Sequence, residues 1–207
     1  MPWKKMIYLC VAVGVVAISY LGWKLTARGA YESAEYTVLE ADSLFEIREY
    51  PDLILAVTNM QFESQGNNGS FMRLFRYISG ANDTEQKVAM TTPVFMETEG
   101  HDDLGQMGFV IPTKVTEQRV PEPSDKDVAL RKRIGGRFAV IRYAGRMNTE
   151  SVTKAEEELR QWISERGLIS DGDAESAGYD PPWTPGPFRR NEILIRIESK
   201  QECTACE

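Results

Sequence analysis

Aromatic, thioether and guanidinium side chains are the groups in this chain whose types and spacing could do chemistry. Phe71 and Phe75 fall one helical turn apart, and Arg76 follows directly. Two rings at this spacing can form a flat apolar floor for a planar ligand, and a guanidinium can pair with a carboxylate on the edge of that ligand. Aromatic residues at helical spacing are also common in plain protein cores. The pattern alone therefore leaves a binding surface and a packed core both open.

No catalytic set accompanies these residues. The single histidine, His101, lies among acidic residues in the loop 97–103 and is interpreted as facing solvent. A Ser/His/Asp triad would have to use it, and no nucleotide-binding loop is present. The 31 acidic residues form carboxylate pairs by chance. The sequence thus favours a binding module over an enzyme. Four methionines could supply thioether ligands to a soft metal centre: Met72, Met90, Met96 and Met107.

The two C-terminal cysteines, Cys203 and Cys206, form a C-x-x-C motif. Covalent haem attachment would require a histidine next, and Glu207 stands there instead. We interpret the pair as a surface dithiol that can close into a small disulfide, with a weak metal site as the alternative. We expect no structural or catalytic metal.

The first 28 residues differ in composition from the rest. Residues 6–23 are uncharged and mostly apolar, and a helix of 18 residues reaches about 27 Å, enough to cross the hydrocarbon core. A cleaved signal peptide is the competing interpretation. It would place Arg28 where cleavage needs a small side chain. We therefore expect an uncleaved membrane anchor over residues 1–28, followed by a linker over residues 29–35.

Charge bears on both orientation and partners. Two basic residues flank the apolar run on each side, and the N-terminal amine favours a cytoplasmic N-terminus with the domain outside the cytoplasm. All 31 acidic residues but only 20 of the 24 basic ones lie after Arg28, which gives the remainder a net charge of −11. Such a field repels nucleic acid, so we expect no nucleic-acid partner.

Apolar periodicity predicts the secondary structure of the remainder. In chain order the expected elements are two strands within residues 36–60 that turn at Pro51-Asp52, a helix over residues 70–80 capped by Asn68 or Ser70, strands over residues 88–98 and 105–112, strands over residues 127–133 and 137–143 joined at Gly135-Gly136, a helix capped by Asn148 or Thr149 and closed by Gly167, a Gly/Asp/Ser loop before Tyr179, and a strand over residues 192–198. Trp162 and Ile163 fall on the apolar face of the second helix.

Both halves read as two strands, a helix and one or two further strands. An internal duplication of a β-β-α-β-β unit is the simplest explanation. We therefore predict an α+β fold in which one antiparallel sheet curls into a distorted β-barrel flanked by two helices, with an N-terminal transmembrane helix.

Several short motifs, in their order and spacing, resemble the SOUL/haem-binding protein family. They are Tyr77-Ile78-Ser79-Gly80 with Asn82, KVAMTTPVFM at residues 87–96, Phe109-Val110-Ile111-Pro112, Pro121-Glu122-Pro123-Ser124-Asp125, Tyr143-Ala144-Gly145, Gly178-Tyr179-Asp180-Pro181-Pro182 and Arg189-Arg190-Asn191-Glu192. The resemblance covers about residues 36–199 and leaves residues 200–207 as a tail.

The resemblance implies non-covalent binding of haem or another tetrapyrrole. Carried over position by position, it assigns the ligand site to six residues: Phe71, Met72, Phe75, Arg76, Trp183 and Thr184. With the predicted anchor, this implies a membrane-tethered tetrapyrrole buffer, carrier or sensor, single-pass and facing away from the cytoplasm.

Two other functions remain in view. The same architecture is similar to effector-binding modules of the gyrase-inhibitor-like type, which use a buried acidic residue against a cationic ligand. A hydrolase using paired carboxylates is the least favoured alternative.

Overall fold

The computed structural model describes residues 31–61, 69–98, 104–181 and 184–198, together with Trp3, Tyr8, residues 11–14 and Val16 near the N-terminus. The chain forms two compact units, Met1–Ala30 and Tyr31–Glu207. Residues 11–14 are helical. No helix in the described part of the chain is both long and apolar enough to span a bilayer. The predicted anchor over residues 1–28 lies largely outside the described residues.

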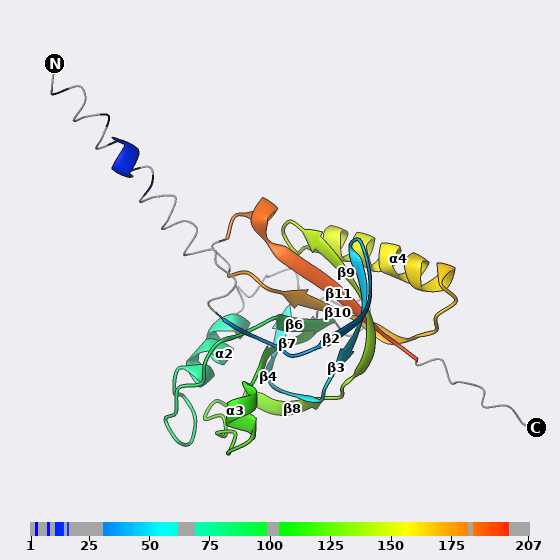
Figure 1. Ribbon diagram of the computed structural model, residues 1–207. Helices are drawn as coiled ribbons and strands as arrows, with labels where there is room; N and C mark the ends of the chain where they lie inside the picture. Colours follow the sequence, from blue (N-terminus) through cyan, green and yellow to red (C-terminus); the bar gives the residue numbers. More distant parts are fainter. Residues whose placement is uncertain are drawn as a thin grey trace, which may run out of the picture. The chain divides into compact units, whose positions relative to one another are not determined.

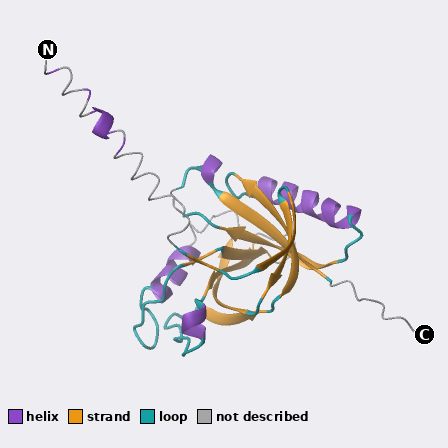
Figure 2. Ribbon diagram, in the orientation of Figure 1, coloured by secondary structure: helices purple, strands orange, loops and turns teal. Residues whose placement is uncertain are grey.

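Unit Tyr31–Glu207 is built on a nine-stranded antiparallel sheet (Figures 1 and 2). Its elements, in chain order, are β1 (Glu32–Ser33), β2 (Thr37–Asp42), β3 (Phe45–Tyr50), β4 (Leu53–Gln61), α2 (Ser70–Ile78), β5 (Thr91–Thr92), β6 (Val94–Thr98), β7 (Leu104–Val110), α3 (Thr113–Thr116), β8 (Ala129–Arg133), β9 (Gly136–Ala144), α4 (Thr149–Glu165), β10 (Ser170–Gly178), the 3-10 turn η3 (Gly186–Phe188) and β11 (Arg190–Ile197). The α+β class predicted from the sequence is confirmed.

The strand order reflects two equivalent halves. It runs β2-β3-β9-β11-β10-β6-β7-β4-β8. Apart from β2, the N-terminal half supplies β3, β4, β6 and β7, and the C-terminal half supplies β8, β9, β10 and β11. From the centre of the sheet outward, the order β6, β7, β4 in the first half matches the order β10, β11, β9 in the second. The first strand of each half lies at the outer edge of the other half: β3 pairs with β9, and β8 pairs with β4. This exchange ties the two halves into one sheet.

The curled sheet has an inner and an outer face, because side chains alternate along each strand. The inner face carries one core, which includes Phe95, Phe138 and Leu194. On the outer face, α4 covers β9 and β11 while α2 covers β4 and β7 (Figure 1). Strands β6 and β10 therefore lie between the two helices.

The longer helix begins and ends as predicted. The Asn148 side chain accepts a hydrogen bond from Ser151 N at 2.9 Å, and Ser151 Oγ accepts one from Asn148 N, forming a capping box. Gly167 has a φ of 63°, which suits glycine just past a helix end. The shorter helix differs from the expectation: its N-cap is Gly69 at φ 83°, and Ser70 is already a buried helical residue.

Three strand predictions were wrong in detail. Residues 36–60 contain three strands rather than two, because Ser43, with a φ of 57°, turns the chain between β2 and β3. The segment predicted as a Gly/Asp/Ser loop contains β10, a central strand whose small side chains give no apolar alternation. Residues 88–98 form two short strands separated by Pro93 rather than one.

The segment after the predicted anchor is integrated into the domain. Strand β1 pairs in parallel with β5, and Ala34 N donates a hydrogen bond to Thr92 O at 2.7 Å. Ala34 is buried in the inner core. The predicted linker, residues 29–35, thus includes a strand and a core residue.

Trp162 is buried on the α4 face, as predicted, and stacks on Phe45 with ring centroids 5.1 Å apart. We expect Trp162→Ala to lower the free energy of unfolding by about 3–5 kcal/mol, because the truncation leaves a cavity between α4 and the sheet. Urea unfolding monitored by circular dichroism measures this. Gln161→Ala, at an exposed neighbouring position, is the control. A Trp162→Ala protein as stable as this control would contradict the packing described.

Candidate functional site

The apolar side chains of helix α2 cover more of its circumference than the part that packs on the sheet. Its buried face consists of Ser70, Leu74, Tyr77 and Ile78. At 100° per residue, Phe71 and Phe75 continue this face on one flank and Met72 lies beyond them. The half-buried Phe71 packs against the core, whereas Phe75 is 43% and Met72 52% exposed. Apolar surface therefore extends from the core into solvent.

The two phenylalanines form a stacked pair. Their ring centroids lie 6.1 Å apart with an interplanar angle of 13°, and the Phe71 ring meets Phe109 of β7 edge-on at 5.3 Å. Phe71 thus anchors the pair to the sheet, and Phe75 is its solvent-facing member. The structure brings these two predicted site residues together.

Arg76 lies on the other flank of α2. On the helical wheel it is about 100° from Phe75 and nearer Arg73, whose guanidinium bonds to Thr58 and Asn59 of β4. Arg76 is exposed and pairs loosely with Asp125 at 3.7 Å. The helix therefore has an apolar flank toward β7 and β6 and a basic flank toward β4.

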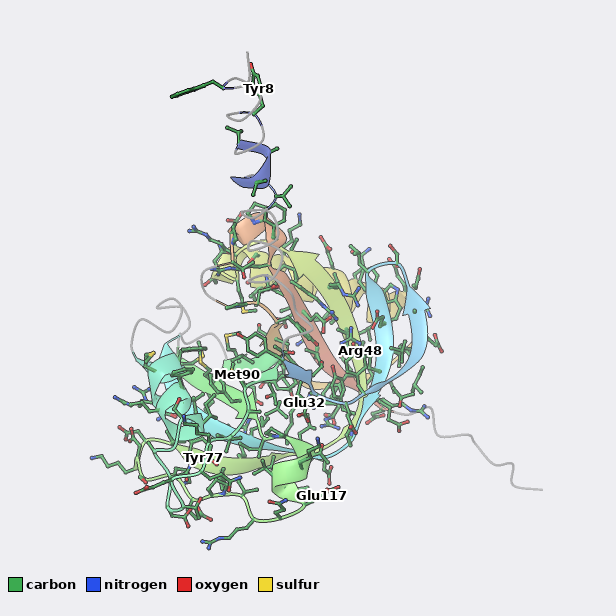
Figure 3. The ribbon with its side chains drawn as sticks, turned by 60° about the vertical axis from the view of Figure 1, so that its left-hand side comes forward. Tyr8, Glu32, Arg48, Tyr77, Met90 and Glu117 are labelled. Atoms are coloured by element: carbon green, nitrogen blue, oxygen red, sulfur yellow. The ribbon has the colours of Figure 1, made fainter. Side chains whose placement is uncertain are left out.

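Apolar side chains continue from Phe71 across the outer face toward α4. Val94 and Met96 of β6 pair with Phe109 and Met107 of β7, and on the other side with Gly178 and Ser176 of β10. Met90, labelled in Figure 3, joins the same cluster. So do Met147 and Val152 at the start of α4. We call the set Phe71, Phe75, Met90, Val94, Met96 and Met147 the interhelix strip; Phe75 is exposed and the other five side chains are half-buried.

The centre of the interhelix strip is adaptable. Gly178 has no side chain, and the Met96 and Met147 methyl carbons lie 3.5 and 3.9 Å from the position that its Cβ would take. Methionine side chains are unbranched and repack readily around different shapes. This part of the surface can therefore adjust to a flat apolar ligand without moving the backbone.

The proline-rich segment follows β10 directly. Thr184 is 2% exposed, and its Oγ1 is buried without a hydrogen-bond partner in the described part of the chain. Its carbonyl accepts a hydrogen bond from Arg189 Nε at 2.8 Å. Trp183, His101, Cys203 and Cys206 lie outside the described residues. The structure thus gives Thr184 a buried position beyond the end of β10, and Trp183 remains a prediction.

Two hollows lie away from these residues. One of about 160 Å³ is lined by β1 and the segment Pro51–Ile54 among others, and one of about 260 Å³ lies beside Glu175 and Arg196. Both are smaller than the roughly 300–1,000 Å³ typical of sites that enclose small molecules. A ligand as large as a tetrapyrrole would therefore bind on a surface rather than inside either hollow.

A buried ionic network lies at one end of the inner face. Arg48 and Glu192 have fully buried side chains and form a two-point pair at 2.7 and 3.0 Å. Tyr179 Oη donates to Glu192 at 2.8 Å, and Arg190 bonds to the same carboxylate. Figure 3 labels Arg48 near the strands of the inner core. The network joins β3 to β11 across β9, which lies between them.

The electrostatics of this network follow from burial and charge. Desolvation opposes ionisation of Glu192, but its hydrogen bonds and charge interactions with Arg48 and Arg190 outweigh that effect and lower its pKa to about 2. Burial, with the Glu192 charge beside it, raises the pKa of Tyr179. Glu192 is therefore ionised at neutral pH, and its charge is balanced by the arginines that pair with it.

Comparison with known proteins decides the family. A sequence model of the SOUL heme-binding protein family matches residues 31–196. The chain belongs to this family. The SOUL match covers the described sheet up to the penultimate residue of β11, both larger helices and the proline-rich segment. No curated protein matches the sequence.

Solved structures share the fold of this SOUL protein at low identity. The C-terminal domain of EcmrR superposes with a TM-score of 0.55 at 12% identity, covering 79% of this chain and 98% of that one. A structure described as a hydrolase from Listeria innocua gives 0.56 at 11%, covering 77% and 94%. EcmrR in complex with DNA gives 0.57 at 11%, covering 95% and 68%. At these identities the likeness concerns the fold alone.

Sequence reasoning missed two features of the SOUL domain. The Arg48–Glu192 pair joins residues 144 positions apart, and no local pattern reports such a contact. The contribution of Met147 to the interhelix strip was also missed, because it precedes the helix cap and has no periodic partner. Met90 and Met96 were identified, but as thioether donors rather than as part of a continuous surface.

Proposed function

We propose that this protein is a membrane-tethered, non-covalent tetrapyrrole-binding protein that acts as a buffer, carrier or sensor, with haem or a related macrocycle as ligand. The stacked Phe71–Phe75 pair supports this most directly, because its outer ring is 43% exposed on an apolar flank. Exposed apolar surface of this kind is a feature of ligand and interaction sites. Membership of the SOUL family points to the same ligand class.

The interhelix strip is the proposed contact surface. A macrocycle lying flat on it would cover several hundred Å² of apolar surface, worth about 25 cal/mol per Å². After the costs of association, this supports roughly micromolar binding. Arg76 contributes little in this proposal, because it lies on the opposite flank and is screened by solvent.

The tether is part of the proposal. It rests on the 18-residue uncharged run over residues 6–23 and on the weak cleavage site after it. The balance of flanking charges favours a domain outside the cytoplasm. Mass spectrometry of the N-terminus of the membrane-bound protein tests the tether, since a chain that begins near Tyr31 would overturn it.

The gyrase-inhibitor-like alternative is less well supported. Such a module needs a buried carboxylate that is free for a cationic ligand. Glu192 is buried but already pairs with Arg48 and Arg190 and accepts a hydrogen bond from Tyr179. A cationic ligand would have to displace three arginines to reach it, because Arg142 also pairs with Glu192 at 3.5 Å.

A visible absorption titration tests the proposed function. Unit 31–207 contains the sheet and its three cores, so it is suitable for solution work. We expect haemin and metal-free protoporphyrin IX to bind with similar, roughly micromolar affinity, because the apolar contact supplies most of the binding free energy. Tighter binding of haemin alone, with a shifted Soret band, would instead indicate protein ligation of iron. Binding of neither would overturn the proposal.

A further inference from the structure

Arg146 is a cation held at the α4 end of the interhelix strip. Its backbone is fixed by the start of α4, where its carbonyl accepts a hydrogen bond from Ser151 Oγ at 2.9 Å. Its side chain lies along the proline-rich segment: Cγ, Nε and Cδ are 3.1, 3.6 and 3.9 Å from the position that a Cβ at Gly186 would take. The stem of this exposed side chain therefore packs against Gly186, which restricts where the guanidinium can lie.

Nothing in the described part of the chain neutralises this guanidinium. The nearby Arg142 and Arg190 both pair with Glu192, whereas Arg146 forms no ion pair with any described residue. Acidic residues outnumber basic ones in this unit. A positioned arginine without a carboxylate is therefore a candidate for binding an external anion.

Arg146 also adjoins the apolar surface. It precedes Met147, whose methyl carbon is 3.9 Å from the Gly178 Cβ position in the middle of the strip. Thr184, with its unpaired buried hydroxyl, and Arg189, which bonds to the Thr184 carbonyl, belong to the same proline-rich segment. The α4 end of the strip thus combines apolar surface with polar donors. At the α2 end, Arg76 faces away toward Asp125.

We propose that Arg146 binds the acidic edge of the ligand, so that the site selects planar macrocycles carrying carboxylates on one side. The ligand's apolar body would lie on the Phe71–Phe75 pair and the methionines, and its carboxylates would point to the proline-rich segment. This assignment rests on the proposed function, and it replaces Arg76 by Arg146 as the carboxylate partner.

Comparing protoporphyrin IX with its dimethyl ester separates the contribution of the ligand's carboxylates to binding from that of its apolar ring. Fluorescence titration of unit 31–207 should show the free acid binding about three- to fivefold more tightly than the ester, as expected for a partly exposed ion pair. Arg146→Ala should reduce this ratio to about one while leaving ester binding unchanged. Arg146→Glu should reverse the preference, and raising the salt concentration should lower the wild-type ratio.

Arg137→Ala is the matched control. Arg137 is also exposed and without an ion pair among the described residues, but it lies at the opposite end of β9, roughly 20 Å or more along the strand. We expect it to leave the acid-to-ester ratio unchanged, and Arg76→Ala likewise. Equal binding of acid and ester by the wild type, or a ratio that survives Arg146→Ala, would overturn the assignment while leaving the proposed function intact. Failure of both porphyrins to bind would overturn both.

Discussion

Replacing Glu192 by alanine is expected to lower the free energy of unfolding by about 3–5 kcal/mol. The substitution removes the two-point carboxylate partner of the Arg48 guanidinium, whose side chain is completely buried, and leaves only the single ion pair of its Nε with Glu46 at 2.6 Å. A buried charge that loses most of its compensation is costly in this way even when the intact pair adds little net stability. Chemical unfolding of unit 31–207 measures the change, and Glu198→Ala, which removes an exposed carboxylate just after β11, is the control. A Glu192→Ala protein as stable as this control would show that Arg48 is hydrated or neutralised by another group.

The pH dependence gives an independent check on the same pair. The folded-state pKa of Glu192 is about 2, below its ordinary value of 4.5. Stability contributed by this group is therefore present above about pH 4.5 and is lost as pH falls through about 2, by roughly 3 kcal/mol in all. Glu192→Gln should remove this component, so the stability difference between wild type and variant should shrink as the solution is acidified from pH 5 to pH 2. A difference that stays constant over this range would contradict the lowered pKa.

Phe75→Asp is expected to abolish tetrapyrrole binding. The substitution places a carboxylate where the proposed macrocycle would lie, and it removes the exposed member of the stacked pair. Because Phe75 is already 43% exposed, the protein should remain folded, with little change in its unfolding midpoint. Leu44→Asp makes the same kind of change at another exposed apolar side chain, in the β2–β3 turn, and should leave binding intact.

Two further variants sharpen the binding experiment. Arg76→Ala should weaken haemin binding only slightly, because Arg76 lies on the basic flank of α2. His101→Ala should change neither the affinity nor the Soret position if the ligand is held by apolar contact.

Wild-type affinity in Phe75→Asp would exclude the α2 flank from the site. Loss of the bound-haem spectrum in His101→Ala would assign iron ligation to the loop 97–103.

Local sequence patterns predicted those features of the fold that depend on interactions between residues close in sequence. The Asn148 cap, the apolar face around Trp162 and the glycine after α4 all follow from interactions between residues close in sequence. Strand β10 was missed because a central strand need not alternate when small residues such as Ala174 and Ser176 suit a surface crowded by neighbours. The exchange of β3 and β8 between the halves is a long-range property that no sequence window contains.

The candidate site was predicted unevenly for the same reason. Helical spacing alone placed Phe71 and Phe75 together, and the structure stacks them. Spacing also placed Arg76 beside them, but a residue one position further on lies 100° around the helix, which turns it to the other flank. Arg146 carries no periodic signal at all. Its position depends on the fold bringing the start of α4 against Gly186, 40 positions later in the chain.

The parallel pairing of β1 with β5 has a mechanical consequence for a tethered domain. If residues 1–28 are held in a bilayer, any tension on the domain acts first on this two-residue strand, which forms a separate two-stranded sheet with β5. Two residue pairs should yield long before the nine-stranded sheet does. Peeling residues 31–36 would lengthen the tether by up to about 20 Å and would withdraw Ala34 from the inner core. Strand β1 would therefore detach and extend first under tension, while the nine-stranded sheet and the proposed ligand-binding surface stay folded.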